Sequence, residues 1–269
     1  MAPRTKSSAA GVRGVRRCPV AADGEVAWSR EGAIARIALG RPGASPRLGA
    51  RSYAALCAAA HEIDHHEEIR VVLVESLGRD FCGGATSEAP AADPSPDGVT
   101  ALSGLRVPVV ALLRGLVLDE GLEIALACDL RVASRDAVLG LTQVGRGGLP
   151  AHGGTQRLPR LVGRARALRM LLLSERVAAP VALAWGLVDE VAAPGRLPAA
   201  GRALAGRLAA RGPIAQRFAK EALGAALDLP LTEGLRLEGD LYVLLQTTRD
   251  REEGLASFRE RRPPVYLGK

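Results

Sequence analysis

The sequence contains few aromatic residues: Phe, Trp and Tyr together make up 3% of its 269 residues, although 48% of the residues are hydrophobic. The core must therefore be built from Ala, Leu and Val. The sequence also lacks a basic stripe interleaved with aromatic side chains, on which single-strand binders stack bases. Much of the net charge of +7 comes from residues 1–17, and the rest from arginines scattered along the expected helices. We therefore expect no nucleic-acid partner.

Cysteine and histidine are sparse, and their spacing does not favour a metal site or a disulfide framework. The cysteines, which show no CxxC spacing, are Cys18, Cys57, Cys82 and Cys128. Cys128 falls in an apolar run that suits a small core residue. His61 and His65 are spaced i, i+4 and could bind a metal from one helix face, but the acidic residues around them favour a solvated face. We expect no metal and no redox cofactor.

Long apolar runs are absent as well, since none approaches the ~20 residues that span a bilayer. Residues 1–22 are basic and rich in small side chains, without the apolar centre of a signal peptide. We expect a cytoplasmic protein in which residues 1–22 form a disordered basic tail. The remaining length suits one large domain, or a core with an appendage.

Alternating and continuous apolar runs predict a mixed α/β protein. Strands are expected at 26–29, 33–39, 71–74, 107–113 and 130–134, with helices at 52–66 and 122–128. Residues 80–98 form a long loop rich in Gly, Ala, Pro and Ser, and loops of this length are often functional. From Leu197 the pattern is helical almost throughout, with breaks at Gly212 and Pro230.

The most informative stretch runs from Arg114 to Asp129 and reads RGLVLDEGLEIALACD. A glycine turn and a polar break precede a helical run that is apolar except for Glu123. Burying a lone carboxylate costs several kcal/mol unless it is paired or protonated, so such a residue usually has a function. The apolar strand at 107–113 would place the positive N-terminus of this helix at the end of a strand. There its backbone N–H groups can face an anion or a developing oxyanion.

Together with four further motifs, this stretch resembles the enoyl-CoA hydratase/isomerase family, also called the crotonase superfamily. The motifs are DFCGGA at Asp80–Ala85, GGTQRL at Gly153–Leu158, ALAWGLVD at Ala182–Asp189 and EGLASFRERRP at Glu253–Pro263. They occur in the family's order and at its spacing, over residues 25–264. The resemblance implies a crotonase-like α/β fold with a spiral core of ββα repeats at 23–197. A C-terminal helical region at 198–269 would then form a homotrimer or homohexamer.

The resemblance also implies an acyl-CoA substrate and roles for individual residues. The backbone N–H groups of Ala85 and Glu120 would form an oxyanion hole that stabilises a thioester enolate. Glu123 matches the first catalytic glutamate of the hydratases; the alternative is a buried glutamate bonded to the backbone. The residues that would contact the substrate are Cys82, Gly83, Gly84, Ala85 and Gly121.

Two positions depart from the family's pattern. The second hydratase glutamate aligns with Gln143, whose amide can orient a water or a thioester but exchanges no proton near neutral pH. Glu120 stands where relatives usually carry a glycine. It could complement the helix dipole after an Asp119 cap. Alternatively, Glu120 and Glu123 could form a relocated catalytic pair, because carboxylates spaced i, i+3 share a helix face and one pKa is pushed up.

We therefore expect an enoyl-CoA hydratase-like lyase in which Glu123 handles the proton, with Gln143 and Glu120 as further catalytic candidates. Two alternatives stay open. One is a single-carboxylate crotonase of another reaction, such as a decarboxylase or a slow hydratase. The other is a catalytically silent acyl-CoA carrier or partner subunit.

Overall fold

The structure of the chain is a computed structural model, which describes residues 16–17, 26–86 and 97–269. Its strands are β1 (Arg16–Arg17), β2 (Val26–Glu31), β3 (Ile34–Leu39), β4 (Val71–Ser76), β5 (Val109–Leu113), β6 (Leu116–Leu118), β7 (Leu130–Ser134), β8 (Val138–Gly140), β9 (Arg176–Ala178) and β10 (Glu190–Ala192). Its α-helices are α1 (Ala50–Asp64), α2 (Gly98–Ser103), α3 (Glu120–Ala127), α4 (Gly154–Val162), α5 (Arg164–Leu172), α6 (Ala179–Ala184), α7 (Leu197–Ala209), α8 (Pro213–Ala225), α9 (Leu231–Gln246) and α10 (Arg249–Glu260). A short 3-10 helix, η1, spans Gln143–Arg146.

The main sheet has the strand order β1-β2-β3-β4-β5-β7-β10. Its first three strands are antiparallel, and the pairs from β3 to β10 are parallel. Strands β4 and β5 are buried at every residue, because helices cover both faces of a parallel sheet. This double burial explains why these strands read as continuous apolar runs in the sequence, whereas β3 alternates.

A smaller sheet consists of β6, β8 and β9 and connects the main sheet to α3. After β5 the chain turns at Gly115, which has φ +53°. A Cβ at Gly115 would lie 2.3 Å from Asp80 Oδ1, so the turn requires glycine. The chain then forms β6, which pairs with β8, before α3 begins. As the sequence predicts, the Glu123 helix begins at the end of a strand, but that strand is β6, which was not predicted and lies between β5 and α3.

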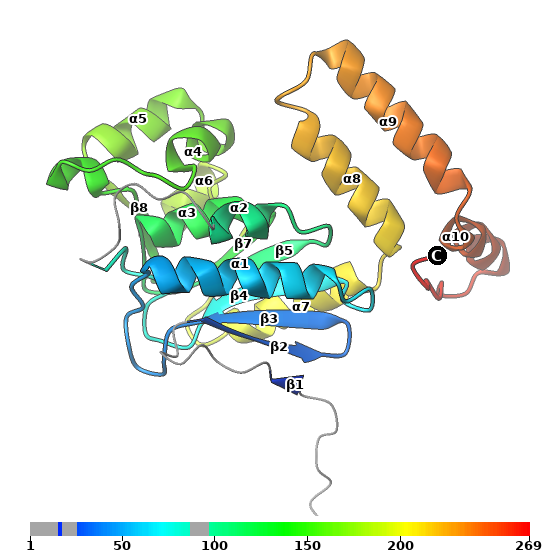
Figure 1. The fold of residues 1–269 in the computed structure, drawn as a ribbon, viewed down its shortest axis with the longest axis horizontal. Coiled ribbons are helices and arrows are strands. Elements are labelled where there is room, and N and C mark those ends of the chain that lie inside the picture. The colour runs from blue at the N-terminus through cyan, green and yellow to red at the C-terminus, as the bar shows by residue number, and fades with distance from the viewer. Residues whose placement is uncertain (1–15, 18–25, 87–96) are drawn as a thin grey trace, which may run out of the picture.

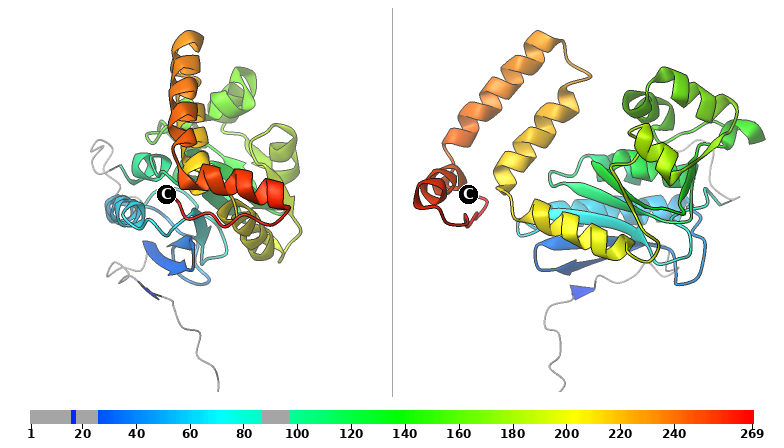
Figure 2. Two further views of the ribbon diagram at one scale, coloured as in Figure 1. Left: turned by 90° about the vertical axis from the view of Figure 1, so that its right-hand side faces the viewer. Right: turned by 180° about the vertical axis from the view of Figure 1, so that it is seen from behind.

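Helices lie on both faces of the main sheet (Figures 1 and 2). Helices α1 and α2 cover one face, and α7 packs on β4, β5 and β7 from the other. Gly201 of α7 approaches the sheet so closely that a Cβ there would lie 2.5 Å from Leu112 Cδ1. Leu197 and Ala205 of α7 are buried in the same cluster. Helix α7 thus belongs to the core, and the separate helical region begins after it rather than at residue 198.

Helices α8, α9 and α10 form an arm that extends away from the core (Figure 2). Helix α8 has no buried residue, and Leu241 is the buried residue of α9. The breaks before α8 and α9 fall at Gly212 and Pro230, where the sequence predicts them. None of the helices in the described ranges is long and apolar enough to cross a membrane.

Several elements differ from the sequence-based expectations. Helix α2 and the short strands β6, β8, β9 and β10 were not predicted, because runs of three to six residues carry little periodic signal. Arg16 and Arg17, expected in a disordered tail, pair with Arg30 and Ser29 as strand β1. The other residues of the expected tail, 1–15 and 18–22, lie outside the described residues, as do 23–25. Residues 87–96 of the long loop lie outside them too.

Candidate active site

Two segments that are far apart in the sequence lie side by side at the start of α3. Cys82 forms a parallel bridge with Val117 of β6, and Cys82 N donates to Leu116 O at 3.0 Å. Gly121 of α3 packs against this bridge so tightly that a Cβ there would lie 2.6 Å from Cys82 Cβ. Segment 82–85 is thereby fixed beside the N-terminus of α3.

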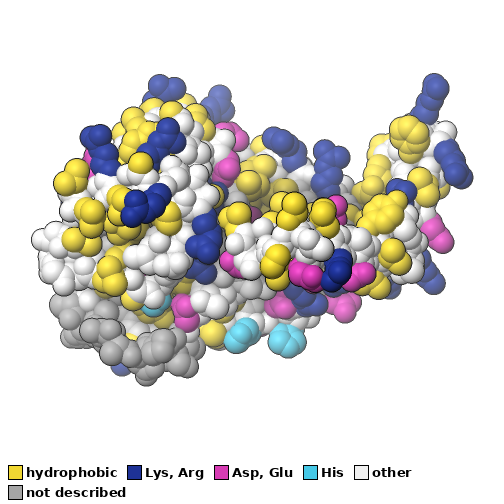
Figure 3. Space-filling model, turned by 90° about the horizontal axis from the view of Figure 1, so that it is seen from above, with side chains coloured by type: hydrophobic (Ala, Val, Ile, Leu, Met, Phe, Trp, Pro, Cys, Tyr) yellow, Lys and Arg dark blue, Asp and Glu magenta, His cyan; other side chains and the backbone are white. Residues whose placement is uncertain are grey.

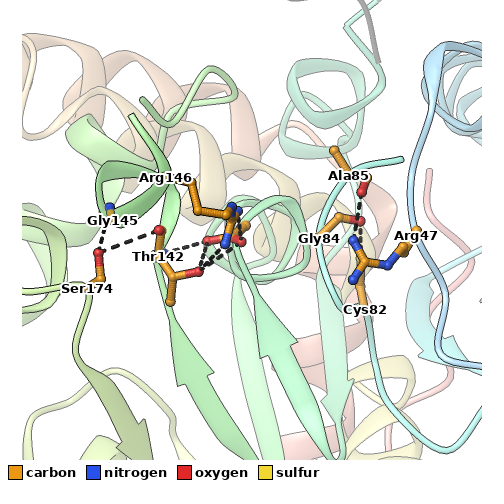
Figure 4. Close-up of polar contacts among 9 residues, drawn as sticks. Arg47, Cys82, Gly84, Ala85, Thr142, Gly145, Arg146 and Ser174 are labelled. Carbon is orange, nitrogen blue, oxygen red and sulfur yellow. Dashed lines mark hydrogen bonds and ion pairs between the residues drawn. The ribbon is translucent and has the colours of Figure 1, made fainter. Parts of the chain in front are cut away.

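The peptide groups around Ala85 are oriented by pairing with Leu48. Leu48 N donates to Gly84 O at 3.0 Å, and Thr86 N donates to Leu48 O at 2.9 Å. Because successive peptide groups of an extended segment alternate in direction, the N–H and C=O of Ala85 point away from Leu48. On that side the guanidinium of Arg47 donates to Ala85 O at 3.1 Å (Figure 4).

The side chain of Glu120, the first residue of α3, folds back over this segment. Its Oε2 atom would lie 3.4 Å from a Cβ placed on Gly84. Burial raises the pKa of the Glu120 carboxyl and the charge of Asp119 adds to the rise, while hydrogen bonding from the backbone N–H groups of Glu120 and Ala85 opposes it. Glu120 Oε2 is itself buried without a hydrogen-bond partner in the described residues. The Glu120 carboxyl therefore lies beside the segment that carries Ala85, one of the two residues that the sequence predicts for an oxyanion hole.

Asp119 is at the N-cap position of α3, but its side chain makes no capping bond. It has φ 54° and ψ −116°, a conformation that favours glycine and costs about 1–3 kcal/mol for other residues. The carboxylate accepts instead from the N–H and hydroxyl of Thr142 and, at 2.7 Å, from Arg146 Nη2. Figure 4 shows Thr142 and Arg146 close together, with Ser174 and Gly145 beside them. The part of the cap hypothesis that relies on the Asp119 side chain is therefore wrong. Instead, this side chain connects η1 to the N-terminus of α3.

Glu123 is fully buried one turn into α3. Its Oε1 atom accepts from His152 N at 2.7 Å and from Gly154 N at 2.8 Å. Its Oε2 atom is buried and has no hydrogen-bond partner within the described residues. Burial raises the pKa of this carboxyl, and the charge of Glu120 adds to the rise, whereas the two N–H groups and the His152 ring oppose it. One oxygen is thus anchored and the other is available to a ligand, which suits proton transfer.

Gln143 begins η1 and is 6% exposed. Its side-chain Nε2 and Oε1 atoms are both buried without a partner in the part of the chain that the structure describes. A buried amide normally bonds to protein or water, since an unpaired buried polar group costs about 1–3 kcal/mol. Gln143 therefore offers one donor and one acceptor to whatever binds in the site.

Two residues that sequence analysis did not single out lie at the site. The rings of Tyr53 (α1) and His152 are stacked, with centroids 4.3 Å apart and planes tilted by 27°. His152 Nδ1 lies 3.3 Å from Asp97 Oδ1. The backbone N–H of His152 is one of the two groups that anchor Glu123. No local pattern marks Tyr53, because only the packing of α1 on α2 brings it to α3.

The other expected substrate contacts have structural partners in the described residues. The thiol of Cys82 is buried and donates to Gly84 O at 3.6 Å, and burial raises its pKa to about 12, so it is protonated at neutral pH. Gly83 N donates to Pro46 O at 2.8 Å. Gly84 adopts φ +107°, which glycine tolerates best. These residues shape the segment that presents Ala85.

The histidine pair on α1 lies away from this site and faces solvent. His61 and His65 lie in an exposed stretch, and His65 Nδ1 contacts His61 O at 2.6 Å. Within residues 16–17, 26–86 and 97–269, no group of three or more His, Cys, Asp or Glu side chains is arranged to hold a metal.

Comparisons with known proteins show the family and the fold. Residues 29–269 match the family model described as enoyl-CoA hydratase/isomerase. An enoyl-CoA hydratase/isomerase of Bacillus subtilis, YngF, is 40% identical over 87% of this chain and 95% of its own length. The (E)-benzylidenesuccinyl-CoA hydratase of Thauera aromatica is 36% identical over 87% of this chain and 96% of its own. The crystal structure of an enoyl-CoA hydratase from Bacillus anthracis superposes with a TM-score of 0.84 at 33% identity, covering 91% of this chain and all of that one.

Fold, motif geometry and relatives together define an enzyme of the crotonase superfamily. The chain belongs to the enoyl-CoA hydratase/isomerase family. The resemblance and the fold class predicted from the sequence are thereby confirmed.

Proposed function

We propose that the protein hydrates an enoyl-CoA ester, with Glu123 as the group that moves the proton. The observation that carries this proposal is the Glu123 carboxylate itself. It is fully buried, anchored through Oε1 by two backbone N–H groups, and unpaired at Oε2. It lies in the first turn of α3, whose first residue, Glu120, lies beside the segment that carries Ala85.

In this mechanism the thioester oxygen binds the N–H groups of Ala85 and Glu120. These donors stabilise negative charge on that oxygen more than they stabilise the neutral thioester. The oxygen of a water forms a bond to the β-carbon while Glu123 Oε2 takes one of its protons. The α-carbon of the resulting enolate then receives a proton from Glu123, which returns to its starting state. Water is thereby added across the double bond, with one carboxylate acting first as base and then as acid.

We propose that the carboxylate of Glu120 turns aside for this reaction, because its Oε2 atom lies beside Gly84, next to the residue whose N–H group would bind the thioester oxygen. Its raised pKa lowers the cost of that movement, since a protonated side chain binds the hole less strongly than a carboxylate. We propose that Glu120 contributes its backbone N–H to the hole and that its side chain competes with the substrate. A relocated Glu120–Glu123 pair is the alternative, supported by the mutual effect of the two charges on the Glu123 pKa.

Gln143 orients the reactants in this proposal and transfers no proton. Its unpaired amide atoms can donate to, and accept from, a water or the acyl group. Hydratases with two glutamates divide the acid and base roles, so we expect this chain to be slower than they are. The alternative function, binding and carriage of acyl-CoA without turnover, needs only the oxyanion hole.

The C-terminal arm supports the further proposal that the protein is a homotrimer or a dimer of trimers. Large hydrophobic side chains are exposed along it, including Leu223, Leu231, Tyr242 and Phe258, which are 61–84% exposed. A cavity of about 420 Å³ between α8 and α9 is lined mostly by Ala and Leu. Figure 3 shows hydrophobic side chains along this projecting part of the molecule. Exposed apolar surface on this scale marks an interface.

The test is incubation with a panel of enoyl-CoA esters while the absorbance of the conjugated thioester is followed. Loss of absorbance that requires the protein supports hydration. If the absorbance is stable but acyl-CoA raises the melting temperature, the carrier function replaces it, because a ligand of the folded state stabilises that state. If the protein shows no turnover, and millimolar acyl-CoA does not raise its melting temperature, both the hydratase and the carrier functions are refuted.

A further inference from the structure

Tyr53 has a buried hydroxyl that nothing in the described protein satisfies. The residue is 9% exposed, and its Oη atom is buried without a hydrogen-bond partner in the described residues. A tyrosine buried in an apolar core normally bonds its hydroxyl to a nearby carbonyl or carboxylate. Phenylalanine would fill the same space without the cost of burying an unpaired hydroxyl. The hydroxyl therefore indicates that a ligand binds here.

The position of this hydroxyl is fixed by packing rather than by hydrogen bonds. One face of the ring stacks on His152 at a centroid distance of 4.3 Å. The backbone of Tyr53 is held by α2, since a Cβ on Gly98 would lie 2.5 Å from Tyr53 O. The backbone N–H of His152 in turn donates to Glu123 Oε1 at 2.7 Å. A rigid chain of contacts therefore connects the tyrosine ring to the Glu123 carboxylate.

The charged groups that face the hydroxyl are those of the active site. Burial raises the pKa of Tyr53, and the carboxylates of Glu120 and Glu123 raise it further, followed by Cys82 and Asp97. The phenol is therefore protonated at neutral pH. It is a neutral donor that lies near two carboxylates and bonds to neither.

The unpaired atoms of Tyr53 and Glu123 have complementary hydrogen-bonding roles. Glu123 Oε2 is an acceptor without a donor, and Tyr53 Oη is a donor without an acceptor. A water can donate to the first and accept from the second, and it leaves a lone pair for attack. A methylene or a carbonyl of the acyl chain would satisfy at most one of the two groups.

We propose that Tyr53 is a third catalytic residue, whose hydroxyl donates to the oxygen of the attacking water while Glu123 Oε2 accepts its proton. The proposal rests on the proposed hydratase function. In the forward reaction the hydrogen bond holds the oxygen as it becomes the β-hydroxyl of the product; in the reverse reaction it stabilises the departing hydroxyl. Tyr53 keeps its proton throughout, so the balance of atoms in the hydration step is unchanged.

Tyr53→Phe tests this role, with Tyr242→Phe on the exposed face of α9 as the matched control. Two reactions are measured: hydration of an enoyl-CoA, and exchange of the α-proton of a saturated acyl-CoA with D2O. Exchange uses the oxyanion hole and Glu123 but needs no water at the β-carbon. We expect Tyr53→Phe to lower kcat for hydration by about 10- to 100-fold, the effect of one hydrogen bond to a charged or developing group. KM and the exchange rate should stay within about twofold of wild type, and the melting temperature should not fall.

Each other result overturns the proposal in a distinguishable way. If Tyr53→Phe hydrates as fast as wild type, the hydroxyl has no part in catalysis, although the proposed function stands. If hydration and exchange fall together, the ring supports the site structurally and does not hold the water. A wild-type protein that exchanges α-protons and hydrates no enoyl-CoA refutes the proposed function itself.

Discussion

Glu123→Gln should abolish turnover and leave the fold intact. The amide oxygen of glutamine can still accept from the N–H groups of His152 and Gly154, which hold Oε1 at 2.7 and 2.8 Å. The shape of the site and the affinity for acyl-CoA should therefore be retained. Proton transfer by a positioned side chain contributes about 10²–10⁴-fold to a rate, or about 3–5 kcal/mol of the barrier. We expect kcat for hydration to fall within that range while KM changes little.

The same substitution should stabilise the protein at neutral pH. Burial, followed by the charge of Glu120, raises the pKa of Glu123 above its usual 4.5, so the ionised form is disfavoured in the folded state. The wild-type protein therefore loses stability relative to the variant as pH rises through the raised pKa, and the difference vanishes below pH 4.5. Because one buried oxygen is unpaired, we expect the free energy of unfolding of Glu123→Gln to exceed that of wild type by about 1 kcal/mol at neutral pH. The melting temperature of the variant should then be higher by roughly 2–4 °C.

The assay combines enoyl-CoA turnover, binding of acyl-CoA by calorimetry and thermal melts across a pH series. Glu221→Gln on the exposed surface of α8 is the control for a lost charge, and it should change neither rate nor stability. A variant that keeps more than about a tenth of wild-type kcat would refute the role of Glu123, because general acid–base groups contribute more than that. A loss of stability at neutral pH would show that the charge of Glu123 supports the fold.

Three further outcomes are expected. Gln143→Glu should raise hydratase kcat, since it supplies a second carboxylate to divide the acid and base roles; unchanged activity would show that Gln143 is outside the reacting geometry. Glu120→Gly should lower KM for enoyl-CoA, because it removes the carboxylate that competes for the oxyanion hole, whereas a sharp fall in kcat would establish the relocated pair with Glu123. Light scattering at micromolar concentration should give the mass of a trimer or hexamer, and Leu231→Asp together with Leu235→Asp should shift it to smaller species; a monomeric wild type would contradict the role of the arm.

The sequence predicts the parts of the site that depend on local pattern. Glu123 is recognisable because it interrupts an apolar helical run, and Ala85 because the motif DFCGGA at Asp80–Ala85 resembles the family's. Both predictions need only a few neighbouring residues. The strands β4 and β5 are predictable for the same reason, since double burial produces an uninterrupted apolar run.

The parts that the sequence does not reveal depend on tertiary packing. Tyr53 lies on α1 and reaches α3 only because α1 packs on α2, against Gly98. His152 acts through its backbone N–H, which has no side-chain signature. The position of α7 in the core also follows from close contact, at Gly201 against Leu112, and not from its helical pattern. Each of these contacts joins residues that are far apart in the chain.

Asp119 shows how the departures from the family pattern are connected. Its positive φ costs about 1–3 kcal/mol that glycine would avoid. Asp119 is 1% exposed, and the cost of burying its charge is offset by hydrogen bonds from the N–H and hydroxyl of Thr142 and by the ion pair with Arg146. Those bonds hold η1, and with it Gln143, against the N-terminus of α3. The charge of Asp119 also raises the pKa of Glu120 and so disfavours its charged form. Asp119, Glu120 and Gln143 therefore form one linked set, in which the residue that strains the backbone also positions the amide and weakens the competing carboxylate.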